Sequence, residues 1–104
     1  MSKVIHKFPL DVLTEKPQTL NLHKGAQVLS AGLDGNKQVC IWVLVDKDEP
    51  LTERRAFMVL MTGDFTKESI ISFIGTVKAS EAPCIMCHVF EVLNMPERIR
   101  DYHD

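Results

Sequence analysis

Hydrophobic and polar positions along the chain mostly alternate with the period of two that is typical of β-strands. Residues 19–23 (Thr-Leu-Asn-Leu-His) alternate leucine with polar side chains, which predicts a strand with one face toward a core and the other toward water. The uninterrupted apolar run at residues 39–45 is rich in β-branched residues and has the length of a strand rather than of a helix. Because both of its faces are apolar, we expect this run to be the central strand, covered on both sides.

Five further segments have the character of strands, and turn residues separate them. Pro9 closes the first, because proline cannot donate to a β-ladder. Asp34-Gly35-Asn36 is the strongest hairpin signal and joins the preceding strand to the central run as an antiparallel neighbour. Gly75 predicts a bulge or a close approach of backbone. The predicted strands are residues 4–8, 19–23, 27–33, 39–45, 54–62, 70–78 and 84–93.

About seven short strands with little helix favour an all-β, mainly antiparallel fold, either a small sandwich or a partly open barrel. At most one or two short helical turns are expected, one starting at residues 66–69 and one at residues 97–101. A length of 104 residues fits one domain. We expect a single β domain over residues 1–93, followed by a C-terminal tail, residues 94–104, that holds the second turn.

Charge and composition narrow the classes of partner. The formal net charge is −2, with the two signs interleaved, so bulk electrostatics give no attraction to nucleic acid or to an anionic membrane. The sequence has no apolar segment long enough for a signal peptide or a membrane span, so we expect a cytoplasmic protein. In that reducing compartment the three cysteines are expected to be thiols.

The motif Cys84-Ile85-Met86-Cys87-His88 has the spacing of a c-type haem attachment site, and C-x-x-C alone is typical of zinc or thiol redox sites. On a strand, however, Cys84 and Cys87 point to opposite faces and cannot share a metal or form a disulfide. A zinc site also needs a second ligand pair, for which the chain offers only Cys40 and scattered histidines. We therefore interpret both cysteines as packing residues and predict no cofactor and no metal. A dyad of Cys84 and His88 lacks a third orienting group, so we do not expect an enzyme.

Six short motifs spread over residues 4–91 resemble a family of small uncharacterised proteins encoded mainly by bacteriophages and prophages. The resemblance implies a phage source and brings no activity with it. Relatives tend to carry an aromatic residue where this chain has Cys87, which fits a packing role for that thiol. The motifs are Ile5-His6-Lys7-Phe8-Pro9-Leu10, Lys24-Gly25-Ala26 before Val28-Leu29-Ser30, Ile41-Trp42-Val43-Leu44-Val45-Asp46, Thr62-Gly63, Ile74-Gly75-Thr76-Val77 and His88-Val89-Phe90-Glu91.

A small cytosolic domain of phage origin without a catalytic constellation favours an interaction protein. We expect it to bind and inhibit a host bacterial protein, for instance a component of a defence system. The candidate surfaces are the charged loop at residues 46–55, the tail and the sheet edges. An edge strand at Val4–Phe8 can pair with a partner or with a second copy, which also predicts a homodimer. The predicted partner-binding residues are Asp46, Asp48, Glu49, Glu53, Arg54, Arg55, Arg98, Arg100 and Tyr102.

Two other hypotheses stay open at this point. A small-ligand binder that sequesters a nucleotide signal needs convergent donors, and the clustered cations are Lys3, Lys7, Arg54 and Arg55. An enzyme that uses Cys84, Cys87 or His88 is the third hypothesis. Thermal stabilisation by added ligand distinguishes a small-ligand binder from an interaction protein. Substitution of Cys84, Cys87 and His88 tests the enzyme hypothesis.

Overall fold

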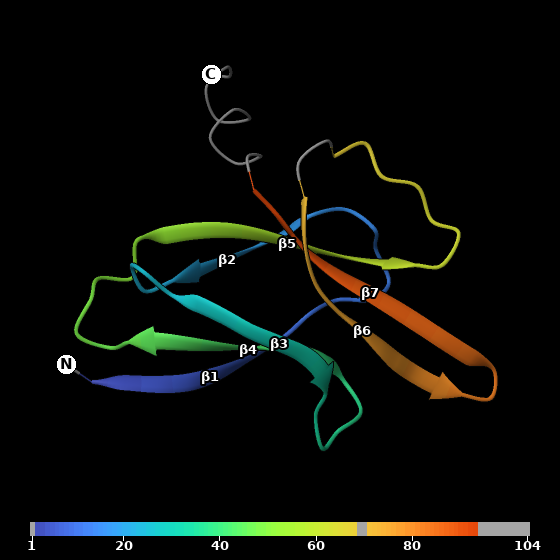
Figure 1. Cartoon of the computed structure of the whole chain (residues 1–104), viewed down its shortest axis with the longest axis horizontal. Helices are drawn as coiled ribbons and strands as arrows, with labels where there is room; N and C mark the ends of the chain where they lie inside the picture. Colours follow the sequence, from blue (N-terminus) through green and yellow to red (C-terminus); the bar gives the residue numbers. More distant parts are fainter. Residues whose placement is uncertain (1, 69–70, 94–104) are drawn as a thin grey trace.

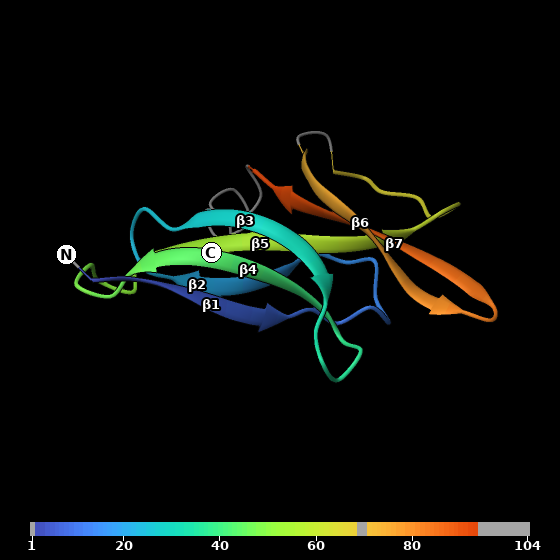
Figure 2. The same ribbon diagram turned by 60° about the horizontal axis from the view of Figure 1, so that its bottom comes forward.

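The computed structural model describes residues 2–68 and 71–93. Within these ranges the chain forms seven strands, all paired antiparallel in two sheets. The three-stranded sheet has the order β1-β4-β3, and the four-stranded sheet has the order β2-β5-β7-β6. The sheets stack as two layers, and the end of the β6–β7 hairpin extends beyond the three-stranded sheet (Figures 1 and 2). The strands are β1 (Lys3–Pro9), β2 (Gln18–Leu22), β3 (Gln27–Leu33), β4 (Val39–Asp46), β5 (Glu53–Met61), β6 (Ile71–Glu81) and β7 (Cys84–Val92).

One hydrophobic core fills the space between the two sheets. Alternate residues of β4 point into it and are almost completely buried, as the period of two requires. The four-stranded sheet contributes the facing side chains from β2, β5 and β7. This packing of two inner faces holds the sandwich together. The most buried members are Leu22, Ile41, Val43, Val45, Phe57, Val59, Cys87 and Val89.

The predicted fold class is confirmed: the described chain is an all-β antiparallel sandwich, and its sheets do not close into a barrel. All seven predicted strands are present, and β4 lies between β1 and β3 as expected of a central strand. The expectation that β4 is covered on both sides is wrong. On its outer face only Cys40 is fully buried, whereas Trp42 and Leu44 are partly exposed, because within residues 2–68 and 71–93 no second layer lies over this sheet.

The first strand ends at Pro9, as predicted, and Pro9 itself is the last residue of β1, opposite Cys40. The predicted reason, a missing donor in the ladder, needs correction. The ladder continues past it, with the Leu10 N–H donating to the Val39 carbonyl at 2.9 Å. Since neighbouring residues of a strand direct their backbone groups to opposite sides, the nitrogen of Pro9 faces away from β4 and no ladder bond is lost.

The prediction for Gly75 is confirmed in both of its forms. The register of β6 on β7 shifts between Phe73 and Gly75, which marks a bulge. A Cβ atom built on Gly75 would lie 3.6 Å from the Cβ of Ala31 on β3, so the two sheets approach each other closely at this position. The edges β3 and β6 therefore meet along one side of the sandwich, while β1 and β2 form the edges on the other side.

The predicted hairpin at Asp34 is confirmed, and its loop is closed by hydrogen bonds to one carboxylate. Asp34 Oδ1 accepts from the N–H groups of Asn36 and Gln38, both at 2.9 Å, and Oδ2 accepts from Lys7 Nζ at 2.9 Å. The positive φ of 64° in this loop falls on Lys37 rather than on Gly35. The hydrogen bond from Gln38 and then the Lys7 ammonium lower the pKa of Asp34 from its ordinary 3.8 to about 2.

This depressed pKa predicts how the hairpin responds to acid. The carboxylate contributes its full stabilisation above pH 3.8 and loses it as the pH falls toward 2, where the folded form takes up a proton. Asp34→Asn keeps an oxygen for the loop N–H groups but removes the charge. We expect wild type to melt at a higher temperature than D34N at pH 5 and this difference to vanish near pH 2. Thermal unfolding followed by circular dichroism measures it, and a difference that does not vary with pH would contradict the assignment.

The sequence also predicts two helical turns. Residues 66–68 lie in a loop without helical structure, since their polar side chains bond locally and toward β5. The turn at residues 97–101 and the tail as a whole fall outside the described residues. Nowhere in residues 2–68 and 71–93 does the chain form a helix that could cross a membrane.

Candidate interaction surface

The outer faces of the two sheets differ in how well they are covered. On the four-stranded sheet the apolar residues Ala56, Met58 and Val92 point outward yet are at most 4% exposed. The loop that follows β5 returns over this face, and the Thr66 hydroxyl lies 3.8 Å from the Met58 sulfur. The outward positions of β5 are therefore part of a second, smaller core and not a free surface.

The outer face of the three-stranded sheet carries apolar side chains in contact with water. Ile5 on β1 is 55% exposed and stands directly opposite Leu44, which is partly exposed. Trp42 follows on the same face of β4, and Leu29, 44% exposed, lies in the bulge of β3 at the margin between this face and the side where β3 meets β6. We call Ile5, Leu29, Trp42 and Leu44 the outer apolar face. Scattered exposed apolar residues are ordinary, but a group that includes a tryptophan on one uncovered sheet is typical of interaction sites.

A glycine on the neighbouring strand determines how the Trp42 indole lies. A Cβ atom added to Gly32 on β3 would come within 3.4 Å of the indole atom Cζ3. The edge of the ring therefore lies close to β3 at a position where any larger residue would crowd it. A flat aromatic surface held in this way loses little conformational entropy when a partner packs on it.

The β1 strand borders the outer apolar face, and its backbone has a free side. The ladder with β4 starts where the Ser2 carbonyl accepts from the Lys47 N–H at 2.8 Å, so the even-numbered residues of β1 exchange hydrogen bonds with β4. By the alternation of an antiparallel pair, Lys3, Ile5 and Lys7 direct their N–H and C=O groups away from β4. In the described part of the chain no strand pairs with that side. The sequence prediction that Val4–Phe8 forms an edge is thus confirmed.

The side chain of Lys7 extends from this edge across the sheet toward the β3–β4 hairpin. Its ammonium bonds Asp34 Oδ2 at 2.9 Å, and Asp34 lies in the β3–β4 hairpin on the far side of β4. The Lys7 stem therefore crosses the outer face above Cys40, whose thiol is completely buried. Burial raises the pKa of Cys40, and the hydrogen bond to Asp34 raises the pKa of Lys7.

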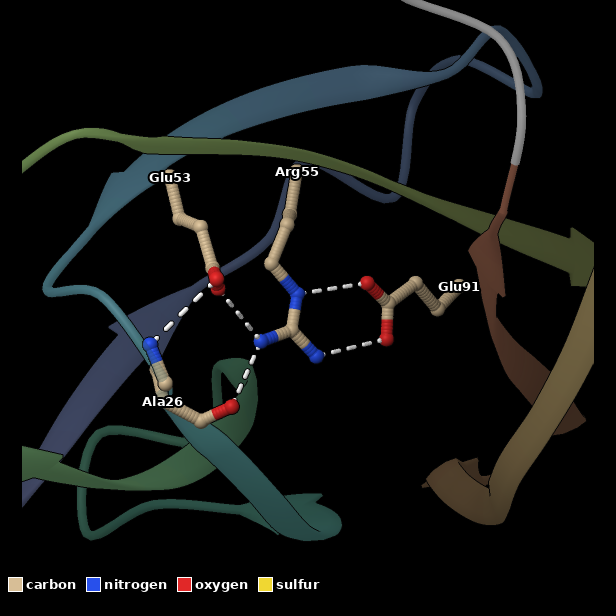
Figure 3. A network of polar contacts seen from close by, with 5 residues as sticks. Ala26, Glu53, Arg55 and Glu91 are labelled. Carbon is tan, nitrogen blue, oxygen red and sulfur yellow. Dashed lines mark hydrogen bonds and ion pairs between the residues drawn. The ribbon is translucent and has the colours of Figure 1, made fainter.

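A second polar feature, the Arg55 network, lies between the sheets where β3 begins (Figure 3). Arg55 forms a two-pronged ion pair with Glu91, with Nε donating to Oε2 at 2.7 Å and an amino group donating to Oε1 at 2.9 Å. Its other amino group donates to the Ala26 carbonyl at 2.6 Å and to Glu53 at 3.3 Å. Glu53 in turn accepts from the Gly25 N–H at 3.3 Å. The network ties β5 and β7 of one sheet to the start of β3 in the other.

The Arg55 network borders a hollow of about 530 Å³ between the beginning of β3 and residues 72–74 of β6. Arg55 is 22% exposed and Glu91 13% exposed, and the hydrogen bond to Glu91 raises the pKa of Arg55. One guanidinium with two carboxylates leaves a net negative charge in the network. With its donors directed at Glu91, Glu53 and Ala26, Arg55 is not positioned to bind a phosphate.

The charged residues predicted to bind a partner do not form one surface. Asp46 ends β4, and its side chain accepts from the Asp48 N–H at 2.9 Å in the exposed turn that also contains Glu49. Glu53, Arg54 and Arg55 belong to β5 rather than to the loop, and alternate side chains point to opposite faces of the sheet. The remaining predicted residues, Arg98, Arg100 and Tyr102, fall outside the part of the chain that the structure describes.

The cations proposed for a nucleotide site are likewise separated. Lys3 and Lys7 project from the outer face of the three-stranded sheet. Arg55 points between the sheets and is engaged by two carboxylates. Arg54 is exposed on the outer face of the four-stranded sheet. Four cations on three different surfaces do not provide convergent donors for one phosphate.

Cys84 and Cys87 lie on opposite faces of β7, as predicted for a strand. Cys87 is completely buried in the core, but the interpretation of Cys84 as a packing residue is wrong, because Cys84 is exposed at the end of the hairpin; all three cysteines are free. His88 lies on the outer face of the four-stranded sheet and not in the core. Its Nε2 is 2.9 Å from the Thr62 hydroxyl and its Nδ1 is 3.1 Å from the Thr76 hydroxyl. Among the described residues no group of three histidine, cysteine or acidic side chains is arranged to hold a metal ion.

Sequence reasoning missed the Arg55 network and the exposure of the outer apolar face. A signal for the network was present, since Arg55 is in phase with the core residues Phe57 and Val59, and Glu91 is in phase with Val89. Two opposite charges at inward positions of different strands indicate a buried ion pair. The exposed face had no such signal, because an apolar position does not reveal whether another layer covers it.

The fold and the surface define a class: a small two-sheet antiparallel β-sandwich that, in the part of the chain the structure describes, has one uncovered apolar face beside a free strand edge. The family DUF7352, a domain of unknown function, matches residues 1–99, and the chain belongs to this family. The match extends beyond residues 4–91 and takes in part of the C-terminal tail. No curated protein and no solved structure matches the chain.

Proposed function

We propose that the protein is a small interaction module that binds a partner protein through the outer apolar face and the adjacent β1 edge. The observation that carries the proposal is a contrast between the two outer faces: the outward apolar side chains of β5 are buried, whereas Ile5, Trp42 and Leu44 of the three-stranded sheet reach water. A partly exposed tryptophan with aliphatic neighbours is the composition of an interface centre, where most binding energy is concentrated.

The nature of the partner follows from the resemblance to phage proteins. We propose that the chain is phage-encoded, acts in the bacterial cytoplasm, and binds and inhibits a host factor such as a component of a defence system. Inhibition by surface complementarity requires a rigid binding face and no chemistry of its own. The sandwich supplies such a face, because Trp42 and Leu44 sit on a strand whose inner residues are anchored in the core.

The proposal is tested by capture with matched variants. The full-length chain is immobilised and exposed to lysate of a bacterial host, in parallel with Leu29→Lys on the outer apolar face and Leu13→Lys in the connection between β1 and β2. Leu13 is 90% exposed, so both variants place a lysine where water already reaches. We expect wild type and L13K to retain the same stoichiometric partner and L29K to retain at least tenfold less.

Inhibition is then measured on the captured partner. Added wild-type protein should lower the activity of that partner, and L29K should not. A partner that L29K retains fully, or the absence of any stoichiometric partner, would overturn the proposal.

A further inference from the structure

We propose that the free edge of β1 accepts an extended segment of the partner as an added antiparallel strand. In this arrangement an apolar side chain of the segment lies beside Ile5 and an acidic side chain lies beside Lys3. The inference rests on the proposed function and specifies how the partner is held. It does not depend on which protein the partner is.

The backbone of β1 has the form that strand addition requires. Lys3, Ile5 and Lys7 direct their N–H and C=O groups to the free side, at the regular spacing of a strand without a register shift. An extended segment placed there satisfies these groups with its own backbone, which is how peptides bind to sheet edges in general. Pro9 ends this series of free N–H groups, because its nitrogen has no hydrogen to donate.

The other edges are poorer templates. The β3 edge has a register shift between Val28 and Ser30, and the β6 edge has two shifts. Bulges disturb the spacing of the free backbone groups and discourage pairing. The β2 edge is regular but has five residues against seven in β1. Among the strands that the structure describes, β1 is therefore the edge best suited to a partner.

The ion pair of Lys7 with Asp34 removes a side chain that would otherwise hinder strand addition at this edge. A lysine on an edge strand normally hinders pairing, because its charge must stay in water. Here the Lys7 ammonium is held 2.9 Å from Asp34 on the far side of β4, so its side chain is drawn inward over the sheet. Ile5 remains as the exposed side chain at the middle of the edge, and Lys3 as the charge near its beginning.

The chemistry of the occupant follows from these two side chains. Directly opposed apolar residues and opposite charges stabilise antiparallel pairs, whereas like charges destabilise them. The matching segment therefore has an apolar residue followed, two positions later, by an aspartate or a glutamate. Added beside Ile5, the apolar residue also extends the row formed by Ile5 and Leu44.

A second copy of the chain matches the edge less well. If two β1 strands pair about a two-fold axis at Ile5, each Lys3 stands opposite the Lys7 of the other copy. Moving the axis by one residue in either direction places a lysine beside Ile5 and gives up the apolar contact. The sequence prediction of a homodimer is therefore an alternative outcome of the test and not the arrangement that the edge favours.

The probe is the capped peptide Ser-Thr-Val-Val-Thr-Asp-Ser, which in the antiparallel register places its second valine opposite Ile5 and its aspartate opposite Lys3. One control peptide carries an N-methyl group on the second valine, which removes a backbone hydrogen bond without changing a side chain. Another has lysine in place of aspartate. The full-length protein is titrated with each peptide, and amide hydrogen exchange is followed by NMR residue by residue.

With the first peptide bound, we expect the exchange of the Lys3, Ile5 and Lys7 amides to slow at least tenfold. The amides of His6 and Phe8 already bond to β4 and should change little. N-methylation should weaken binding at least tenfold, and the lysine peptide should bind several-fold more weakly at low salt. In the protein, Ile5→Lys should abolish peptide binding, and Leu13→Lys, in the exposed connection between β1 and β2, should leave it unchanged.

Several results would overturn the inference. They are binding without protection of these three amides, equal binding of the N-methylated peptide, no binding of any peptide, and protection without peptide that rises with protein concentration. The last result would identify a second copy at the edge. If the peptides fail while capture of the partner still depends on Leu29, strand addition is wrong and the proposed function stands. If the Leu29-dependent capture fails as well, both are wrong.

Discussion

Replacing Arg55 by methionine is expected to lower the free energy of unfolding by about 2–3 kcal/mol. The substitution leaves Glu91, which is only 13% exposed, without its guanidinium partner, and it frees the Ala26 carbonyl and Glu53. An uncompensated carboxylate in a partly buried position is the main cost, and the residual exposure of both side chains keeps the loss below that of a fully buried pair. Urea denaturation at neutral pH measures the change.

Two further variants show whether the loss comes from the ion pair. Arg54→Met changes the neighbouring arginine, which is exposed, and should cost no more than about 0.5 kcal/mol. The double variant Arg55→Met/Glu91→Leu removes both charges, and we expect it to recover most of the stability lost in R55M, since an apolar pair of similar size can replace an ion pair at little cost. If the double variant is instead as unstable as the sum of two independent losses, the pairing is not what stabilises this position.

Replacing Phe57 by alanine is expected to cost about 3–5 kcal/mol, which is a large part of the stability of a domain of this size. Phe57 lies at the middle of β5, is completely buried, and is the largest of the fully buried side chains. Both sheets pack against it, so the cavity left by its removal cannot close by movement of one loop. Equilibrium denaturation at 25 °C is the measurement.

Phe73 is the matched control for that substitution. It is also a phenylalanine on the four-stranded sheet, but it is 60% exposed on the edge strand β6, with its ring 5.6 Å from that of Phe90 in an edge-to-face contact. Phe73→Ala should cost no more than about 1.5 kcal/mol, the value of an aromatic pair. Equal losses for the two variants would show that Phe57 is not at the centre of the core.

Alternation of side chains, a β-branched apolar run and turn residues together were sufficient to locate all seven strands, because each of these signals is local to the strand and does not depend on which strands pair. It also placed Phe57, Val59 and Met61 on one face of β5 and Ala56, Met58 and Leu60 on the other, as the structure has them. Strand order was predictable only at the Asp34 hairpin, where a short turn forces neighbours together. The assignment of β4 and β7 to different sheets depends on long connections, whose paths no local pattern specifies.

The candidate surface was less accessible to sequence reasoning than the fold. Ile5 was recognised as part of an edge strand, but Trp42 and Leu44 were taken for buried residues, because apolar character is the same for a covered face and an uncovered one. Arg55 was assigned to a partner for a similar reason: a charged residue near a loop is usually solvated, and only the position of Glu91 in space shows that the charge is satisfied internally.

The register shifts in β3 and β6 have a consequence for how large an assembly of this protein can grow. A partner strand that occupies β1 extends the three-stranded sheet in one direction only, since the opposite margin, β3, is irregular and lies close to β6. Strands can then be added to this sheet at the β1 margin but not at the β3 margin. If β1 is the edge that a partner occupies, we therefore expect this sheet to form complexes of defined stoichiometry rather than open-ended fibres.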